Sequence, residues 1–123
     1  MKSIYDQRPW LKLYPQWLDH ELEVPESTAL DDFKASVVRR GESPAVCYFD
    51  YAISYGELGR LSSSLAAAFH DLGLKKGDRI LIDLQNVPQF LMATYAAWNI
   101  GAIVVPVNPM YKERELTYFC QDS

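Results

Sequence analysis

The chain has 123 residues, of which 49% are hydrophobic and 23% are charged, and its formal net charge is -4. This length suffices for one domain with a buried core, and the charge excludes the basic footprint of a nucleic-acid-binding protein. The start, MKSIYDQRPW, lacks the apolar core of a signal peptide. The longest apolar stretch, residues 90–107, is broken by Asn99 and Pro106 and falls short of a membrane span. We therefore expect a cytoplasmic protein without a transmembrane segment and without a nucleic-acid partner.

Residues 1–26 are predicted to form an extended arm, because prolines interrupt them repeatedly. Their apolar content is too high for a free tail. The side chains concerned are Trp10, Leu11, Leu13, Tyr14, Trp17 and Leu18. We expect the arm to lie over another surface, either in later sequence or in a partner subunit. A homodimer formed through the arm is one prediction.

Residues 27–123 are predicted to form a single folded unit. Ser27 or Thr28 caps a helix that runs to Arg40 and stops at Gly41. Its apolar stripe is Leu30, Phe33, Val37 and Val38. A strand over residues 45–49 and a short strand at residues 53–54 follow, joined by a turn at residues 50–52.

A second, longer helix is predicted after Ser54, which forms a capping box with Glu57. Gly73 ends this helix, and Leu74 can pack back on it in a Schellman arrangement. The apolar stripe consists of Leu58, Leu61, Leu65, Phe69 and Leu72.

The last third of the chain predicts a βαβ crossover. A turn at residues 75–78 leads into a strand at residues 79–84. Asn86 is expected to cap the next helix, with Pro88 in its first turn and Gln89 in a second cap-like pair. The run 102–107 reads as a strand covered on both faces, with sheet neighbours that this chain does not supply. The fold class is therefore α/β, with parallel-type crossovers and helices packed on a sheet.

Residues 84–88 follow a strand and open a helix, which is the place for an anion site. The loop lacks glycine and Pro88 removes an amide, so helix capping is favoured over phosphate binding. Ser62, Ser63 and Ser64 lie in mid-helix without a nucleophile elbow, and they are read as a small-residue face. Glu113 and Glu115 are read as a solvated first helical turn.

The remaining reactive side chains are isolated. Cys47 and Cys120 are expected to be reduced thiols in or near a core, and His20 and His70 to be surface or packing residues. The pair Asn108-Pro109 after a buried strand is read mainly as a structural corner, with a place on the rim of a ligand site as the alternative. We assign no catalytic, cofactor-binding or metal-ligating residue.

The order of several local patterns resembles the AMP-forming acyl-CoA synthetases, and most of all the bacterial long-chain-fatty-acid–CoA ligases. The resemblance covers nearly the whole chain. Its residues are Arg8-Pro9-Trp10-Leu11, Tyr14-Pro15, His20-Glu21-Leu22 and Pro25 in the arm, then Ile53 to Leu58, Gly77-Asp78-Arg79, Asn86-x-Pro88, Gly101-Ala102, Asn108-Pro109-x-Tyr111, Arg114-Glu115-Leu116 and Asp122-Ser123. Met110 stands where many relatives have a basic residue, and Lys112 where many have a threonine.

This resemblance implies an N-terminal portion of a larger adenylate-forming fold, from an enzyme that joins a fatty acid to CoA with ATP and Mg²⁺. The reactive motifs of the family have no match in this chain, so we expect the chain alone to be inactive. Peripheral membrane association is compatible with a fatty substrate. Two other readings stay open: a self-contained interaction or regulatory module that docks through its arm, and a small-molecule-binding domain with a nucleotide at the strand edge.

Overall fold

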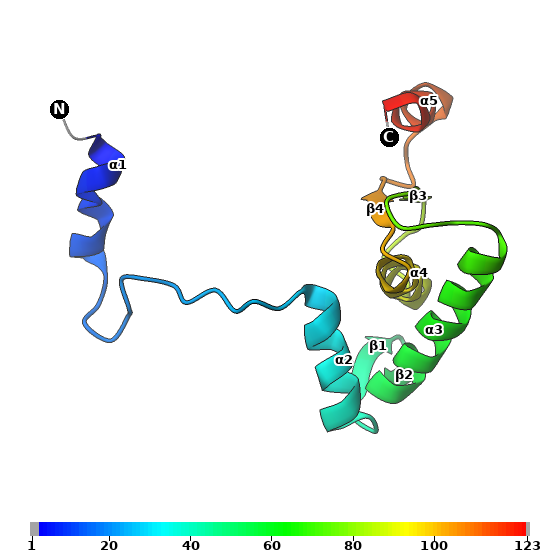
Figure 1. Ribbon diagram of the computed structural model, residues 1–123, viewed down its shortest axis with the longest axis horizontal. Helices are drawn as coiled ribbons and strands as arrows, with labels where there is room; N and C mark the ends of the chain where they lie inside the picture. Colours follow the sequence, from blue (N-terminus) through cyan, green and yellow to red (C-terminus); the bar gives the residue numbers. More distant parts are fainter. Residues whose placement is uncertain (1–2, 123) are drawn as a thin grey trace.

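The computed structural model describes residues 3–122, so Ser123 and the first two residues of the arm lie outside the described part. Figure 1 shows a helical body with an N-terminal arm standing apart from it. The elements in chain order are α1 (Ile4–Gln7), the 3-10 helix η1 (Pro9–Leu13), α2 (Ala29–Arg40), β1 (Pro44–Tyr48), β2 (Tyr51–Ser54), α3 (Tyr55–Asp71), β3 (Arg79–Ile82), α4 (Pro88–Asn99), β4 (Ile103–Pro106) and α5 (Glu113–Asp122). The α/β class is confirmed.

Helix α2 begins as the sequence predicts. The Thr28 Oγ1 accepts a hydrogen bond from the Asp31 amide at 3.2 Å, and the Asp31 carboxylate accepts one from the Thr28 amide at 3.0 Å. This reciprocal capping box satisfies two amides that the helix cannot use internally. The expected apolar stripe is wrong at Val38, which is 88% exposed and lies on the face turned away from the core.

Strands β1 and β2 form an antiparallel hairpin, but its turn differs from the prediction. The first strand ends at Tyr48 and the second already begins at Tyr51, so the turn consists of Phe49 and Asp50. Phe49 itself adopts a positive φ of 51° and is 89% exposed. The sequence supplies no glycine there, and a bulky residue takes the left-handed conformation instead.

Helix α3 has the predicted Ser54 cap, but the reciprocal half of the predicted capping box is wrong, because the Glu57 carboxylate does not bond to the Ser54 amide. The Ser54 Oγ accepts a hydrogen bond from the Glu57 amide, while the Glu57 carboxylate accepts one from the Tyr51 hydroxyl at 3.4 Å. At the other end Gly73 has φ 90°, and the Leu74 amide donates to the Phe69 carbonyl in a Schellman motif. Leu72, predicted to belong to the apolar stripe, is 80% exposed.

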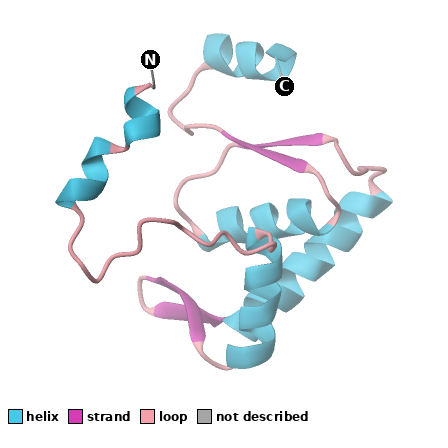
Figure 2. Cartoon of the chain, turned by 60° about the vertical axis from the view of Figure 1, so that its left-hand side comes forward, coloured by secondary structure: helices cyan, strands magenta, loops and turns pink. Residues whose placement is uncertain are grey.

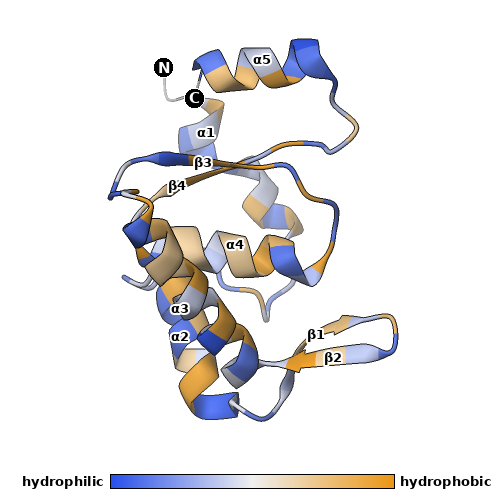
Figure 3. Cartoon of the chain, turned by 90° about the vertical axis from the view of Figure 1, so that its right-hand side faces the viewer, coloured by the Kyte–Doolittle hydropathy of each residue, from blue (hydrophilic) through white to orange (hydrophobic). Residues whose placement is uncertain are grey.

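The predicted βαβ crossover is present, with β3 and β4 paired in parallel. Helix α4 lies on one side of this pair and α5 on the other, as Figures 2 and 3 show. The expected cap is wrong: Val87, not Asn86, is the N-cap of α4, and it makes no side-chain cap bond. Pro88 at the first helical position fixes the backbone there without needing a capping side chain.

Strand β4 is only partly covered within this chain, although α4 and α5 lie on opposite sides of the β3–β4 pair. It is shorter than predicted, and Ile103 at its start is 51% exposed. Within residues 3–122 its only partner strand is β3, so each strand of the pair has one unpaired edge. Strand β4 therefore carries more β-branched apolar surface than the neighbouring elements of this chain bury.

The core lies between the helices. Phe33, Ile53 and Leu58 form its buried cluster, which joins α2 and β2 to the start of α3. Helices α3 and α4 pack closely along a second interface, the α3–α4 seam, where small side chains allow the two backbones to approach. Its members are Ser62, Ala66, Thr94, Ala96 and Ala97, all buried.

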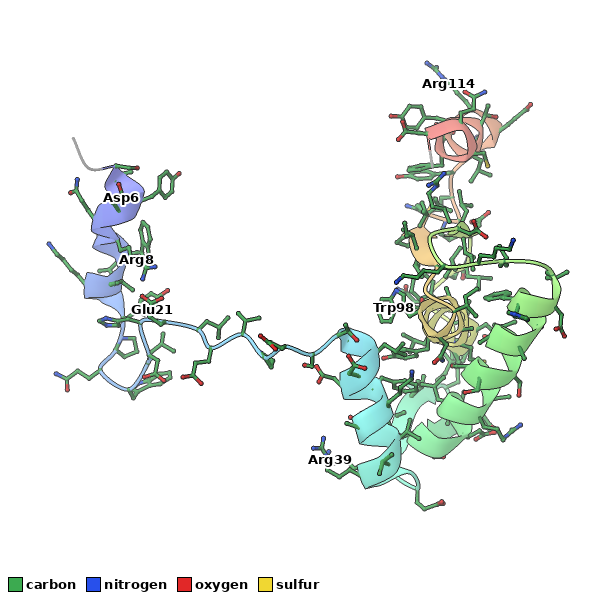
Figure 4. All side chains as sticks on the ribbon, in the orientation of Figure 1. Asp6, Arg8, Glu21, Arg39, Trp98 and Arg114 are labelled. Atoms are coloured by element: carbon green, nitrogen blue, oxygen red, sulfur yellow. The ribbon has the colours of Figure 1, made fainter. Side chains whose placement is uncertain are left out.

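The arm is only partly extended, which corrects the prediction for residues 1–26. Ser3 and Asp6 form a capping box around α1, and Pro9 opens η1. Arg8, whose φ is 44°, forms an ion pair with Glu21 that closes residues 3–21 into a hook, as Figure 4 shows. Regular structure is absent from residues 22–28, which link this hook to α2.

Candidate functional site

Two loops meet at the carboxyl edge of the β3–β4 pair. Parallel pairing places Ile82 beside Pro106, the last residues of their strands. The Val107 amide then donates to the Ile82 carbonyl at 3.1 Å and extends the pairing by one bond. The loops of residues 83–87 and 107–112 therefore leave the sheet side by side. In open α/β sheets this edge is the usual place for ligands.

A depression of about 610 Å³ lies at this edge. The first loop contributes Leu84, Gln85 and Asn86, the second contributes Asn108, Pro109 and Met110, and Phe90 of α4 also lines the surface. The rim is exposed, and Met110 in particular is 82% exposed. Both loops were predicted from the sequence as separate features, and Phe90 was not predicted to lie beside either.

Asn108 holds the second loop in shape. Its Oδ1 accepts a hydrogen bond from the Met110 amide at 3.0 Å, and its carbonyl accepts one from the Tyr111 amide at 2.9 Å. Both bonds close a tight turn around Pro109. The predicted structural role of this corner is confirmed. The turn also places Met110 on the rim of the depression. A place on the rim of a ligand site was the alternative role predicted for the Asn108-Pro109 corner.

The first loop is not built to bind a phosphate group. The Val87 amide donates to the Gln85 carbonyl at 2.7 Å, and the Phe90 amide donates to the Val87 carbonyl at 3.0 Å. Pro88 has no amide to offer. The residues that line the depression carry no charged side chain. Carboxamides and apolar groups suit an uncharged, partly apolar segment of a ligand better than an anion.

The other side chains weighed from the sequence lie away from this edge. Ser62 is fully buried between α3 and α4, and its Oγ has no hydrogen-bond partner. Glu115 accepts a hydrogen bond from the Lys112 amide at 3.1 Å, which supports the start of α5 despite the poor cap that lysine provides. Cys47 and Cys120 are both exposed, so the expectation that they lie in or near a core is wrong.

The histidines have only local neighbours. His20 meets the ring of Tyr14 edge-on, and the His70 Nδ1 lies 3.9 Å from a carboxylate oxygen of Asp71. In residues 3–122 there is no group of three or more histidine, cysteine or acidic side chains placed to hold a metal ion. None of the helices in this part of the chain has both the length and the apolarity to cross a bilayer.

The family model described as "AMP-binding enzyme" matches residues 33–123. The long-chain-fatty-acid–CoA ligase of Bacillus subtilis (strain 168) is 34% identical over 117 residues, which cover 95% of this chain and 21% of that protein. The corresponding ligase of Escherichia coli O157:H7 is 34% identical over 119 residues, with the same coverage. The 2,3-dihydroxybenzoate-AMP ligase of Bacillus subtilis is 37% identical, but over only 55% of this chain.

Solved structures agree with this pattern. The N-terminal subdomain of Klebsiella oxytoca NpsA in complex with anthranilyl-AMSN is similar to 76% of this chain with a TM-score of 0.73 and 30% identity, and the match covers 24% of that subdomain. O-succinylbenzoate Coenzyme A synthetase from Bacillus subtilis, solved in complex with AMP, has the same fold over 73% of this chain, with a TM-score of 0.70 and 24% identity. The chain thus spans about a fifth of the length of the curated ligases it matches over its full extent.

Proposed function

The chain belongs to the AMP-binding enzyme family, and from this premise we propose that it is the N-terminal portion of a fatty-acid–CoA ligase. The supporting observation is coverage. The similarity to two long-chain-fatty-acid–CoA ligases runs over 95% of this chain, so it includes most of the arm. The similarity to the aryl-acid ligase stops at 55%. This difference in coverage favours a fatty over an aromatic acid.

The proposed reaction has two steps. A fatty carboxylate oxygen attacks the α-phosphorus of ATP, which forms an acyl-adenylate and releases pyrophosphate. The CoA thiolate then attacks the acyl carbon, which forms the thioester and releases AMP. Both steps need phosphate charge to be neutralised. The described residues hold no cluster suited to Mg²⁺, so they do not fit that role and we derive no step through the metal.

Within this function, the carboxyl-edge depression is assigned to the rim of the ligand site. Its lining is uncharged and combines carboxamides with apolar surface. Met110 cannot pair with a phosphate, so any contact it makes with CoA or an acyl chain is apolar. We expect the parent enzyme to act in the cytoplasm, with subunit contact through the arm and peripheral association with membranes.

The first test is the activity of the 123-residue chain alone. Incubation with palmitate, ATP and Mg²⁺, followed by trapping of acyl-adenylate with hydroxylamine, should give no product above a protein-free blank. The chain contains no glycine-rich phosphate loop to stabilise the developing charge. Product formation by the pure chain would contradict this part of the proposal.

The second test places the chain in a complete enzyme. The aligned 117 residues of the Bacillus subtilis ligase are replaced by the matching residues of this chain. The hybrid should form acyl-CoA from palmitate and leave 2,3-dihydroxybenzoate unreacted. A hybrid that is folded and binds ATP, yet ligates no fatty acid, would instead favour an interaction module without catalysis. Calorimetric titration of the isolated chain with ATP tests the third reading, a nucleotide bound at the strand edge.

A further inference from the structure

The outer half of the β1–β2 hairpin exposes aromatic side chains around its turn. Phe49 is 89% exposed, Tyr51 is 59% exposed and Tyr48 is 36% exposed. The two tyrosines pair with each other across the hairpin, directly behind the turn. Figure 3 shows the hairpin projecting from the body at the end of the molecule opposite α5. A convex tip of this kind does not enclose a small ligand, so it is suited to enter another surface.

The backbone of the turn is strained in a way that presents the Phe49 ring. Phe49 has a positive φ of 51°, which is disfavoured for any residue with a Cβ. Packing on the body does not compensate for this strain. The ring contact of Phe49 within residues 3–122 is with the neighbouring Tyr48, edge-on at a centroid distance of 4.6 Å. Strained backbone conformations are concentrated at functional positions, which makes the tip a candidate for one.

The end of the body that carries the hairpin is also the least acidic part of the chain. Residues 33–60 contain four lysines and arginines and three acidic residues, whereas the segments before and after them are each net negative. Arg39 and Arg40 are exposed and make no ion pair with any of residues 3–122. The hairpin leaves the body beside them, since the Ser43 amide donates to the Arg40 carbonyl at 2.9 Å. In Figure 4 Arg39 points away from the body.

We propose that this hairpin docks the protein on an anionic lipid bilayer, with the ring of Phe49 entering the boundary between headgroups and acyl chains. Tyr48 and Tyr51 then lie at the headgroup level, where tyrosine is enriched in membrane proteins. The free edges of the two strands stay in the hydrated headgroup region, because unpaired backbone groups are costly in hydrocarbon. Arg39 and Arg40, at the base of the hairpin, face the anionic headgroups.

The proposal gives a surface to the membrane association expected of the parent ligase, and it rests on the proposed function only to that extent. A fatty acid partitions into bilayers, so a ligase docked on one meets its substrate there. No residue of the hairpin lines the carboxyl-edge depression. Vesicle binding by a chain that is expected to have no ligase activity is therefore a separate readout, and either proposal can fail alone.

The first test measures binding of the 123-residue chain to vesicles of equimolar phosphatidylcholine and phosphatidylglycerol, by flotation over a lipid titration. Phe49→Gly removes the ring and suits the positive φ, so the hairpin should stay folded. This variant should partition about tenfold more weakly than the native chain, because no large apolar side chain enters the bilayer. The matched control Leu72→Ala removes a side chain that is 80% exposed at the opposite end of α3, and it should bind like the native chain.

Three further variants separate the contributions of the ring and of charge. Phe49→Trp keeps a large ring at the tip, so it should bind at least as tightly as the native chain. Brominated lipids should quench its fluorescence more than that of the native chain. Asp50 is the only charged residue in 44–54 and repels an anionic surface, so Asp50→Asn should tighten binding. Arg39→Gln/Arg40→Gln should lose the preference for these vesicles over pure phosphatidylcholine.

Two results would overturn the proposal. A native chain that stays unbound at millimolar lipid would favour the groove of a partner protein as the occupant of the tip. Binding that Phe49→Gly leaves unchanged, or that Leu72→Ala weakens equally, would mean that another apolar surface makes the contact. Far-UV circular dichroism verifies that all variants keep their helix content, so that a loss of binding reports the tip and not unfolding.

Discussion

The rings of Phe33 and Tyr95 stack across α2 and α4, with centroids 3.7 Å apart and planes 10° from parallel. Phe33 is the buried residue of α2, and Tyr95 packs against the core cluster from α4. This contact ties the first helix of the body to the crossover helix. It therefore links the arm-bearing half of the chain to the half that carries the candidate site.

Replacing Phe33 with alanine should remove about 3–5 kcal/mol of unfolding free energy, because a large ring is lost from a packed core. Urea unfolding followed by circular dichroism measures the change. The control is Val38→Ala on the exposed face of the same helix, which should change the stability by no more than about 0.5 kcal/mol. Equal effects of the two substitutions would contradict the stacked arrangement.

Tyr95 should make stability sensitive to alkaline pH. Burial, and secondarily the neighbouring Tyr55, raise the pKa of the Tyr95 hydroxyl. The folded chain then resists ionisation, so this contribution to stability is present below about pH 10 and is lost as the pH rises through the folded-state pKa. Urea midpoints measured between about pH 8 and pH 11 should fall more steeply for the native chain than for Tyr95→Phe, which keeps the ring but cannot ionise.

The cap of α2 should respond to acid. The hydrogen bond from the Thr28 side chain, followed by the one from its backbone, lowers the pKa of Asp31. The corresponding stability is present above about pH 4 and is lost as the pH falls through the folded-state pKa. Thr28→Ala should cost about 1 kcal/mol at neutral pH and flatten the acid limb of a stability–pH curve. An unchanged acid limb would count against this capping box.

Ser62 should be replaceable by alanine without loss of stability. Its hydroxyl is fully buried and has no hydrogen-bond partner. Removing it from water therefore costs free energy that no hydrogen bond offsets. We expect Ser62→Ala to raise the unfolding free energy by about 1 kcal/mol. Ser63→Ala, at an exposed position on the same helix, is the control and should stay within about 0.5 kcal/mol. A marked loss at Ser62 would mean that its hydroxyl has a bond in solution.

Gly101 and Gly73 form a matched pair of helix-ending glycines, with φ values of 75° and 90°. A Cβ at Gly101 would lie 2.9 Å from the Lys76 Cγ, whereas one at Gly73 would meet nothing within 4 Å. Both alanine variants should lose about 1–2 kcal/mol to the left-handed backbone, and Gly101→Ala should lose more. Adding Lys76→Ala should remove most of the excess, because only the Lys76 Cβ, at 3.2 Å, then remains close. If Gly101→Ala and Gly73→Ala lose the same stability and Lys76→Ala restores none of it, then the Lys76 side chain moves away from the new Cβ at no cost.

The accuracy of the sequence-based predictions depended on how local each signal is. Ser54 and Gly73 act on backbone groups within a few residues, so both helix ends were predicted correctly. The exposure of Val38 depends on which neighbours the fold supplies, and no local pattern contains that information. The Asn86 cap failed because Pro88 already defines where α4 can begin.

In the candidate site, too, local features could be predicted from the sequence and long-range ones could not. The turn at Asn108 could be predicted, because an asparagine before proline bonds to its own loop. The neighbouring segment, residues 84–88, was also predicted to open a helix. Their meeting at one depression follows from the β3–β4 register, and only the structure supplies that register. The contribution of Phe90 follows from the orientation of α4 and had no sequence signal.

The seam between α3 and α4 has a consequence for how this chain can vary. Ala96 and Ala97 are 0% exposed, and they face a helix that is equally close-packed at Ser62. Any side chain longer than these would force the two backbones apart. A library of random substitutions should therefore recover only glycine, alanine, serine or cysteine at Ser62, Ala96 and Ala97, while the arm linker tolerates almost any residue in a chain selected for folding alone.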